Sequence, residues 1–227
     1  MATLKEHGIL FAAPMVKAIL AGQKWQTRRA VKFPDGAEYD GHRPDGSEVL
    51  CSLPDEPTGA RVIKAPHGPV GRRLWVRETW AAYTGGQTQD GEQWEEYDGK
   101  ISDMRAEDGS CYIHDDGIVY RADGKSDPDR WLSAIHMPRW ASRITLEVTR
   151  VRVERVGDIT PADALAEGFA DFPREPPDED PREVGYQQCV PGALARDRFA
   201  DLWGSINGAG SWASSPWVWV YDFRRVG

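Results

Sequence analysis

Residues 142–156 show the clearest alternation of apolar and polar positions in the chain, and this alternation predicts a long β-strand. Apolar side chains occupy every second position from Ile144 to Val148. From Val151 onward they occupy positions of the opposite parity. One extra residue would produce that change, so the pattern predicts a bend or β-bulge at Thr149–Arg150.

Shorter apolar and polar runs predict further extended segments. In the last of them, Trp217 and Trp219 alternate with valines, which is typical of a strand whose aromatic side chains help to cover a core. The segments expected to be extended are Gln23–Arg29, Arg73–Trp80, Ile118–Tyr120 and Pro216–Phe223.

Residues 158–168 carry a full set of helix signals. Thr160 is the expected N-cap, Pro161 the first helical residue and Asp163 the acidic residue of a capping box, and Gly168 is the expected end. Further helices are predicted over residues 14–21, with Gly22 as the stop, and from residue 193 to about residue 203.

Three stretches rich in Pro, Gly and acidic residues separate these elements and are expected to be loops or insertions, at about residues 33–70, 85–129 and 171–191. A structureless stretch as long as the second is unusual, so we expect short hairpins within it. The chain shows no internal repeat and no hinge-like linker. We therefore expect residues 1–227 to form a single α+β domain, a small β-barrel with flanking short helices and long loop insertions.

The formal net charge of -8 is unevenly distributed along the chain. Residues 85–129 carry a net charge of -9 and residues 171–185 a net charge of -4, so the remaining residues have a net charge of +5. The total charge argues against a nucleic-acid partner, but the charge outside the two acidic stretches does not. No apolar run is long enough to span a bilayer, and we expect no membrane partner and a cytoplasmic location, which the family resemblance described below implies to be in a bacterium or a phage-infected host.

Several kinds of chemistry lack their sequence signals. The chain has no phosphate-binding loop of the Gly-rich type that ends in Lys-Ser/Thr. Its three cysteines show no spacing typical of a zinc site or a disulfide framework, and His114–Asp116 is better interpreted as a solvated loop than as a metal site. We expect neither a metal nor a cofactor.

The segment Leu20–Arg29 concentrates polar and charged side chains directly after a predicted helix stop. From composition alone, the simplest interpretation is a charged strand on the surface. Its sequence, however, resembles the signature of the ASCH domain family, a branch of the PUA-like β-barrels, in which a helix ends in Ala-Gly and is followed by Lys-x-x-Thr and Arg. The strand of residues 73–80 and the strand-then-helix order of residues 142–168 resemble the same family, and the C-terminal segment resembles the larger ASCH proteins of phages and prophages.

This resemblance implies an activity. Small bacterial ASCH proteins hydrolyse the amide of N4-acetylcytidine with a Lys, a Thr and a Glu, and no metal. Matched position by position, these residues fall on Lys24, Thr27 and Glu167, although a shift of one helical turn would select Asp163 instead. An exposed Glu on a frayed last turn is the competing interpretation of Glu167.

The residue chemistry is compatible with that activity. A Thr hydroxyl becomes a nucleophile when a neighbouring base removes its proton, and a Lys can be that base if burial or nearby cations lower its pKa. The spacing raises one difficulty. Lys24 and Thr27 would point to opposite faces of a regular strand, so catalysis would require a bulge or an irregular turn between them.

Five further residues are candidates for contact with the substrate: Arg28, Arg29, Trp75, Arg77 and Glu78. Arg28 and Arg29 follow the motif directly, and one of Arg77 and Glu78 is expected to face the pocket, although a surface ion pair between them is equally compatible with the sequence. Trp75, and also Trp25 and Trp80, could stack on a base.

The family resemblance leaves three functions open. The first is a metal-independent amidohydrolase that removes an acyl group from the exocyclic amine of a cytidine-type nucleoside or base. The second is a module that binds RNA or a modified base without catalysis. The third is a metal-independent ribonuclease. The expected partner is in each case a nucleoside, or single-stranded RNA with an exposed base.

Overall fold

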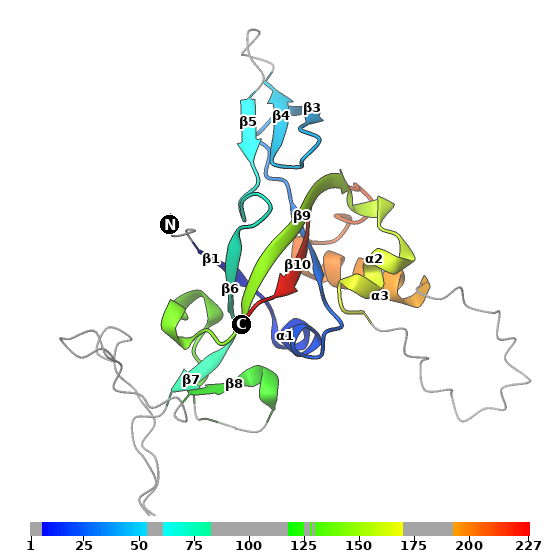
Figure 1. The fold of residues 1–227 in the computed structure, drawn as a ribbon. Coiled ribbons are helices and arrows are strands. Elements are labelled where there is room, and N and C mark those ends of the chain that lie inside the picture. Colours follow the sequence, from blue (N-terminus) through cyan, green and yellow to red (C-terminus); the bar gives the residue numbers. More distant parts are fainter. Residues whose placement is uncertain (1–5, 54–60, 83–117, 125–127, 129, 170–192) are drawn as a thin grey trace, which may run out of the picture. The chain divides into compact units, whose positions relative to one another are not determined.

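The computed structural model describes residues 6–53, 61–82, 118–124, 128, 130–169 and 193–227 (Figure 1). The chain divides into two compact units. The first unit consists of residues 1–7, 18–74 and 146–226, and the second of residues 8–17, 75–145 and 227. The expected insertions at 85–129 and 171–191 lie almost entirely outside the described residues, as do Cys111, Cys189 and residues 114–116.

The first unit is built on three antiparallel strands, β9 (Thr145–Arg155), β10 (Trp217–Arg225) and β2 (Gln26–Ala30). Strand β10 pairs with β9 on one side and with β2 on the other. The predicted bulge is present: Asp222 pairs with Arg150 and Phe223 with Val148, which leaves Thr149 as the extra residue. The apolar side chains are buried on both sides of this bulge, as the change of parity in the sequence predicted.

Two helices cover one face of these strands. Helix α2 (Pro161–Ala166) and helix α3 (Ala193–Asn207) lie side by side (Figure 1). Their buried side chains pack against Val218 and Val220 of β10, and Phe199 and Trp203 of α3 are the largest members of this core. Helix α2 lies where the capping signals predicted it, whereas α3 continues for four residues beyond the predicted end.

Part of the segment expected to be a long loop is instead a small sheet. Strands β3 (Glu38–His42), β4 (Glu48–Ser52) and β5 (Arg61–Lys64) pair in that order, and both pairs are antiparallel. The expectation of a continuous loop over residues 33–70 was therefore wrong, whereas the alternative of an insertion stays a prediction. Within these strands only Val49 and Cys51 of β4 are fully buried. The sequence therefore shows only a weak alternation of apolar and polar residues here, and the surrounding Pro and Gly residues favour the interpretation as a loop.

The second unit contains β1 (His7–Leu10), β7 (Trp80–Ala82), β8 (Ile118–Tyr120) and most of α1 (Ala13–Leu20) and β6 (Arg73–Arg77). The run Arg73–Trp80 is thus two strands rather than one, whereas the predicted strand at 118–120 is confirmed and pairs with β7. The buried residues Trp80, Ala82, Met137 and Ala141 form its core. Single 3₁₀ turns lie at Arg121–Asp123, Ala134–His136 and Arg139–Ala141 here, and at Val156–Asp158 in the first unit.

The mixed helix and strand content confirms the α+β class. Hydrogen bonds order the largest sheet as β1-β6-β9-β10-β2, so within the described residues this sheet has two edge strands and does not close into the expected barrel. None of the helices in the described part of the chain is long and apolar enough to cross a membrane.

Candidate active site around Lys24 and Glu167

Lys24 lies in the short connection between α1 and β2. Gly22, with φ of +71°, ends the helix in the left-handed conformation that the sequence predicted. Lys24 then forms an isolated β-bridge with Glu167, and strand β2 begins only at Gln26. The strand is therefore interrupted at Trp25, between Lys24 and Gln26.

The ammonium group of Lys24 is buried and has three acceptors. Its Nζ atom donates to the carboxylate Oε2 of Glu167 at 2.7 Å, to the backbone oxygen of Glu167 at 2.8 Å and to that of Gln26 at 2.7 Å. The last of these oxygens belongs to the peptide bond that joins Gln26 to Thr27. Lys24 is only 2% exposed. A charged surface strand, the simplest interpretation of composition, is therefore wrong for this segment.

Glu167 is positioned by the ends of its short helix. Thr160 caps α2 by accepting a hydrogen bond from the backbone of Asp163 at 3.1 Å, and Glu167 is the C-cap residue. Gly168 follows with φ of +92°, and a Cβ atom there would lie 2.9 Å from the Cβ of Ala18. The helix dipole disfavours a carboxylate at this end of α2, but the ion pair with Lys24 offsets this unfavourable interaction. Glu167 is 3% exposed, so the frayed-turn interpretation is also wrong.

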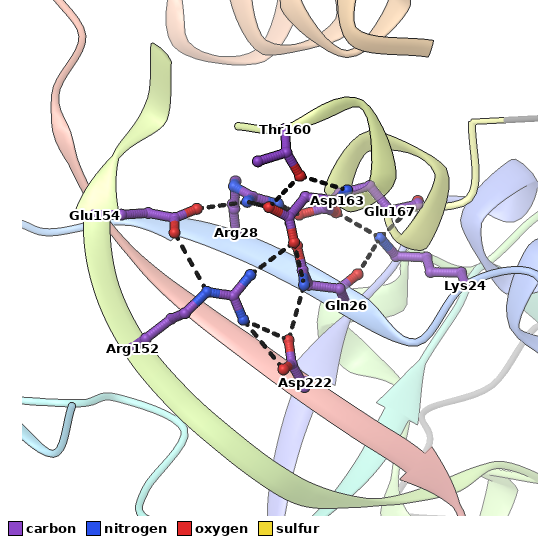
Figure 2. A network of polar contacts seen from close by, with 9 residues as sticks. All are labelled: Lys24, Gln26, Arg28, Arg152, Glu154, Thr160, Asp163, Glu167 and Asp222. Atoms are coloured by element: carbon purple, nitrogen blue, oxygen red, sulfur yellow. Dashed lines mark hydrogen bonds and ion pairs between the residues drawn. The ribbon is translucent and has the colours of Figure 1, made fainter. Parts of the chain in front are cut away.

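Arg28 connects this pair to a larger network of polar side chains (Figure 2). Its Nη1 atom lies 3.2 Å from Oε1 of Glu167, and its Nη2 atom donates to Glu154 and lies 3.5 Å from Oδ2 of Asp163. Arg28 also donates to the side-chain oxygen of Gln26. Asp163, the alternative to Glu167, therefore contacts arginine rather than Lys24.

Strands β9 and β10 complete the network. Arg152 donates to both carboxylate oxygens of Asp222, at 2.9 and 3.1 Å, and to Asp163 at 2.8 Å. The side-chain nitrogen of Gln26 donates to the same two acids. Buried charges are tolerated when they are paired in this way, and the network holds β2, β9, β10 and α2 in a fixed arrangement.

Burial dominates the electrostatics of the two cations that flank Thr27. It lowers the pKa of Lys24 from its ordinary value of 10.5, while Glu167 opposes the change and Arg29 and Arg28 add to it. Burial likewise lowers the pKa of Arg29, against the effects of Glu167 and Tyr221. A lysine of lowered pKa is more readily neutral, which is the form that can accept a proton.

Thr27 lies on the other face of β2 from Gln26 and Arg28. It pairs with Tyr221 of β10, and Arg29 pairs with Trp219, so these four residues share one face of the sheet. Thr27 is 1% exposed. The structure thus brings Lys24 and Glu167 into direct contact, with Thr27 next to them in the chain and facing the same side of β2 as Arg29.

A cavity of about 460 Å³ opens on the face that holds Thr27. It is lined by Arg29 and Trp219 of the central sheet, by Lys32, and by Lys64 and His67 from the segment that includes the end of β5. The backbone N–H of His67 donates to the hydroxyl of Tyr221 at 3.3 Å, so the lining continues to the residue that pairs with Thr27.

The three other candidate residues belong to the second unit and have partners there. The guanidinium of Arg77 lies 4.9 Å from the ring centroid of Trp75 and donates to the backbone oxygen of Met137 at 3.4 Å. Glu78 is 1% exposed and pairs with Arg143, not with Arg77, so a surface pair between neighbours was the wrong interpretation.

The tryptophans differ in exposure. Trp80 is fully buried, with its ring edge-on to Trp140, and cannot stack on a base from solvent, whereas Trp25 is 46% exposed. Trp219 is buried and also lines the cavity, so its expected place in the core describes only part of its surroundings.

Several members of the network escaped the sequence analysis. Asp222 is the one acidic residue in the apolar run 217–223, and Arg152 and Glu154 alternate with buried valines, so their position in the strand pattern was a usable signal. The cavity residues Lys32, Lys64 and His67 gave no comparable signal. Within the described part of the chain, no group of three or more His, Cys, Asp or Glu residues could hold a metal ion.

No family model, curated protein or solved structure matches the chain. The resemblance to the ASCH family therefore depends on the motif and the order of elements, and it stays a prediction.

Proposed function

We propose that the first unit is the catalytic part of a metal-independent amidohydrolase of the ASCH type, which removes an acyl group from the exocyclic amine of a cytidine-type base. The observation that carries the proposal is the buried contact of 2.7 Å between Lys24 and Glu167, formed directly before Thr27. Burial of a lysine is costly unless the group is paired or neutral, and both conditions are accessible in this contact.

The Lys24–Glu167 pair supplies a route to a neutral amine. Burial, with a smaller effect of Arg29 and Arg28, lowers the pKa of Lys24 and favours the neutral amine, whereas the Glu167 carboxylate at 2.7 Å favours the ammonium ion. Opposing effects thus act on the same amine, which is the condition for a base that can both accept and return a proton.

In the proposed reaction, the hydroxyl oxygen of Thr27 attacks the acyl carbon and its proton passes to the neutral Nζ of Lys24. The C–N bond then breaks, and the leaving amine takes that proton. Water hydrolyses the acyl ester on Thr27, releasing a carboxylic acid and restoring the hydroxyl. Nζ donates to the Gln26–Thr27 peptide oxygen at 2.7 Å, which keeps the base close to the nucleophile in the chain.

The test is to follow the release of cytidine from N4-acetylcytidine by the full chain. Thr27→Ala and Lys24→Arg should each lower kcat by at least about 10²-fold, because the first lacks the nucleophile and the second keeps the charge but cannot act as a base. Thr27→Ser retains a hydroxyl and should keep measurable activity. Absence of turnover by the wild-type protein, or full activity of Lys24→Arg, would contradict the proposal.

One observation favours the second candidate, a module that binds a base without catalysis. Each of the three N–H groups of Lys24 already has an acceptor, as expected of a lysine with a purely structural role. In that case cytidine and N4-acetylcytidine would bind to the wild-type protein and to Thr27→Ala equally, with no product formed. A ribonuclease would instead release RNA fragments with cyclic phosphate ends.

A further inference from the structure

The cavity on the same face of the sheet as Thr27 has a strongly one-sided charge. Three charged residues line it, and all three are cations: Arg29 in the wall, and Lys32 and Lys64, which are exposed at its edge. They come from β2, from the residues just after it and from the end of β5. Like charges repel one another, and an anion bound among the three cations would offset that repulsion. The charge of the cavity therefore favours binding of an anion.

His67 adds a neutral polar group to this lining. Burial lowers its pKa to about 4, and the neighbouring Arg29 and His7 add to this shift. Its imidazole is therefore uncharged near neutral pH and can donate or accept a hydrogen bond. The ring packs edge-on against Tyr221 at a centroid distance of 5.3 Å, which fixes its place next to the row that contains Thr27.

The rest of the lining is mainly apolar or aromatic. Trp219 and Ile63 contribute to the wall, and a volume of about 460 Å³ lies within the range of roughly 300–1,000 Å³ that is typical of small-molecule sites. An aromatic wall combined with a cationic edge matches a ligand that has both a planar ring and an anionic group. Trp219 pairs with Arg29 in the strand register, so both features are held by the same two strands.

The cavity and Thr27 are close along the sheet. Arg29, which lines the cavity, is two residues from Thr27 on the same face of β2, a separation of about 7 Å along a strand. A ligand that places its ring near Thr27 can therefore place a second group among the cations. A base attached through a sugar to a terminal phosphate has this division of parts.

We infer that the cavity binds the phosphate monoester of a pyrimidine nucleotide, so that the substrate of the proposed reaction is the acylated nucleotide rather than the free nucleoside. Arg29, Lys32 and Lys64 would hold the phosphate, and the Trp219 wall would contact the sugar or base. The inference rests on the proposed function for the identity of the base, but the phosphate site itself depends only on the cavity.

The first experiment measures binding without chemistry. Cytidine 5′-monophosphate, cytidine and inorganic phosphate are titrated into the full chain by calorimetry. We expect the nucleotide to bind at least about tenfold more tightly than cytidine, because a charge-assisted contact to phosphate is among the stronger hydrogen bonds. We also expect inorganic phosphate to compete with the nucleotide.

The variants test where the phosphate binds. The double variant Lys32→Gln/Lys64→Gln should lose most of the preference for the nucleotide over cytidine. The matched control Arg61→Gln/Arg225→Gln removes two charges from exposed positions of the same unit that do not line the cavity, and it should keep the preference. Equal binding of nucleotide and nucleoside, or equal behaviour of the two double variants, would overturn the inference.

Two further outcomes separate the inference from its alternatives. A single-stranded oligonucleotide without terminal phosphates that binds more tightly than the mononucleotide, with a steep dependence on salt, would overturn it in favour of a polymer. Failure to hydrolyse N4-acetylcytidine and its 5′-monophosphate, with nucleotide binding intact, would refute the proposed function alone. If both are hydrolysed, kcat/KM should be about tenfold higher for the monophosphate.

Discussion

Among the described residues, each unit buries a glutamate against a cation, but the two pairs differ in the cation. In the first unit, Glu167 contacts Lys24 at 2.7 Å and Arg28 at 3.2 Å. In the second, Glu78 accepts hydrogen bonds from Nε and Nη2 of Arg143, at 3.0 and 3.1 Å. The two carboxylates are 3% and 1% exposed. The two carboxylates are thus similarly buried, but the cation in the first unit, Lys24, can release a proton, whereas the cation in the second unit, Arg143, cannot.

This difference separates a pair suited to chemistry from a pair suited to structure. The guanidinium of Arg143 also lies 3.9 Å from the ring centroid of Tyr120 and contacts Asp123, so it fastens β8 and the following turn to Glu78. Lys24 instead donates to two backbone oxygens, and its short link to Glu167 offers a path for a proton. Exchange of the cations between the pairs would remove the proton-accepting group that the proposed reaction needs, without removing the charge.

The largest expected effect is on stability. Lys24→Met retains the apolar part of the side chain but leaves two backbone oxygens without their donor and Glu167 with Arg28 alone, so it should lower the free energy of unfolding by about 3–5 kcal/mol. Arg143→Met should cost less, about 1–3 kcal/mol, because Glu78 can take up a proton in the absence of its partner. Urea unfolding monitored by tryptophan fluorescence measures both.

A double variant sharpens this comparison. Lys24→Met/Glu167→Met removes both charges and should be less unstable than the sum of the two single variants, because neither single ion is left behind. Strict additivity would show that the pair contributes no interaction energy and is not a coupled unit.

The second prediction concerns the backbone that packs against the Lys24–Glu167 pair. In Gly168→Ala, the new methyl group would approach Ala18 to 2.9 Å and Lys24 to 3.1 Å in a left-handed conformation, with an expected cost of about 2–4 kcal/mol. Gly22→Ala is the matched control. Gly22 also has a left-handed φ, of +71°, but no atom lies within 4 Å of the added Cβ, so only the conformational cost of about 1–2 kcal/mol applies. Thermal unfolding measures the stability of both variants. Equal losses of stability in Gly168→Ala and Gly22→Ala would contradict the packing of Gly168 against Lys24.

The third prediction is a pH dependence of opposite sign in the two units. Burial, opposed by Arg143, raises the pKa of Glu78 above its ordinary value of 4.5, so the folded state holds this proton more tightly than the unfolded state. Its contribution to stability is present below pH 4.5 and is lost as the pH rises through the raised pKa. Lys24 has a lowered pKa, so its contribution grows as the pH rises toward 10.5 and is lost as the pH falls through the lowered pKa.

Each contribution is measured as a difference between wild type and variant. The free energy of unfolding of wild type minus that of Glu78→Gln should increase as the pH is lowered. The free energy of unfolding of wild type minus that of Lys24→Met should increase as the pH is raised. Neither slope should exceed about 1.4 kcal/mol per pH unit, the limit for one proton. A slope of the reverse sign for either pair would show that its pKa is shifted in the other direction.

Much of the first unit could be predicted from the sequence because its elements carry local signals. The capping residues of α2, the glycine after α1 and the parity change in β9 each depend on neighbouring residues alone. The contact between Lys24 and Glu167 followed from the family motif rather than from any local pattern, because the two residues are far apart in the chain. The small sheet of β3, β4 and β5 was missed because little of it is buried.

The remaining parts of the site could not be predicted because they depend on which side of a strand faces which element. The motif named Lys24, Thr27 and Glu167 together, but it did not indicate that Thr27 pairs with Tyr221 in the strand register or that Arg28 contacts Glu167. The cavity combines β2, β10 and the segment after β5, which are distant in sequence. The partner of Glu78 proved to be Arg143, and no pattern of spacing indicated it.

The single extra residue in β9 determines the surroundings of the whole network. Arg152 and Glu154 point toward Arg28 and Asp222 only because Thr149 shifts the phase of the strand by one position. If the strand ran regularly through Thr149, Arg152 and Glu154 would lie on the face of Leu146 and Val148, and Val151 and Val153 would face the ion pairs. Deletion of Thr149 would remove the bulge together with its extra residue and leave Arg152 and Glu154 on their present faces. The strand should therefore tolerate the loss of this residue better than the insertion of one residue after it, which would turn both charged side chains over.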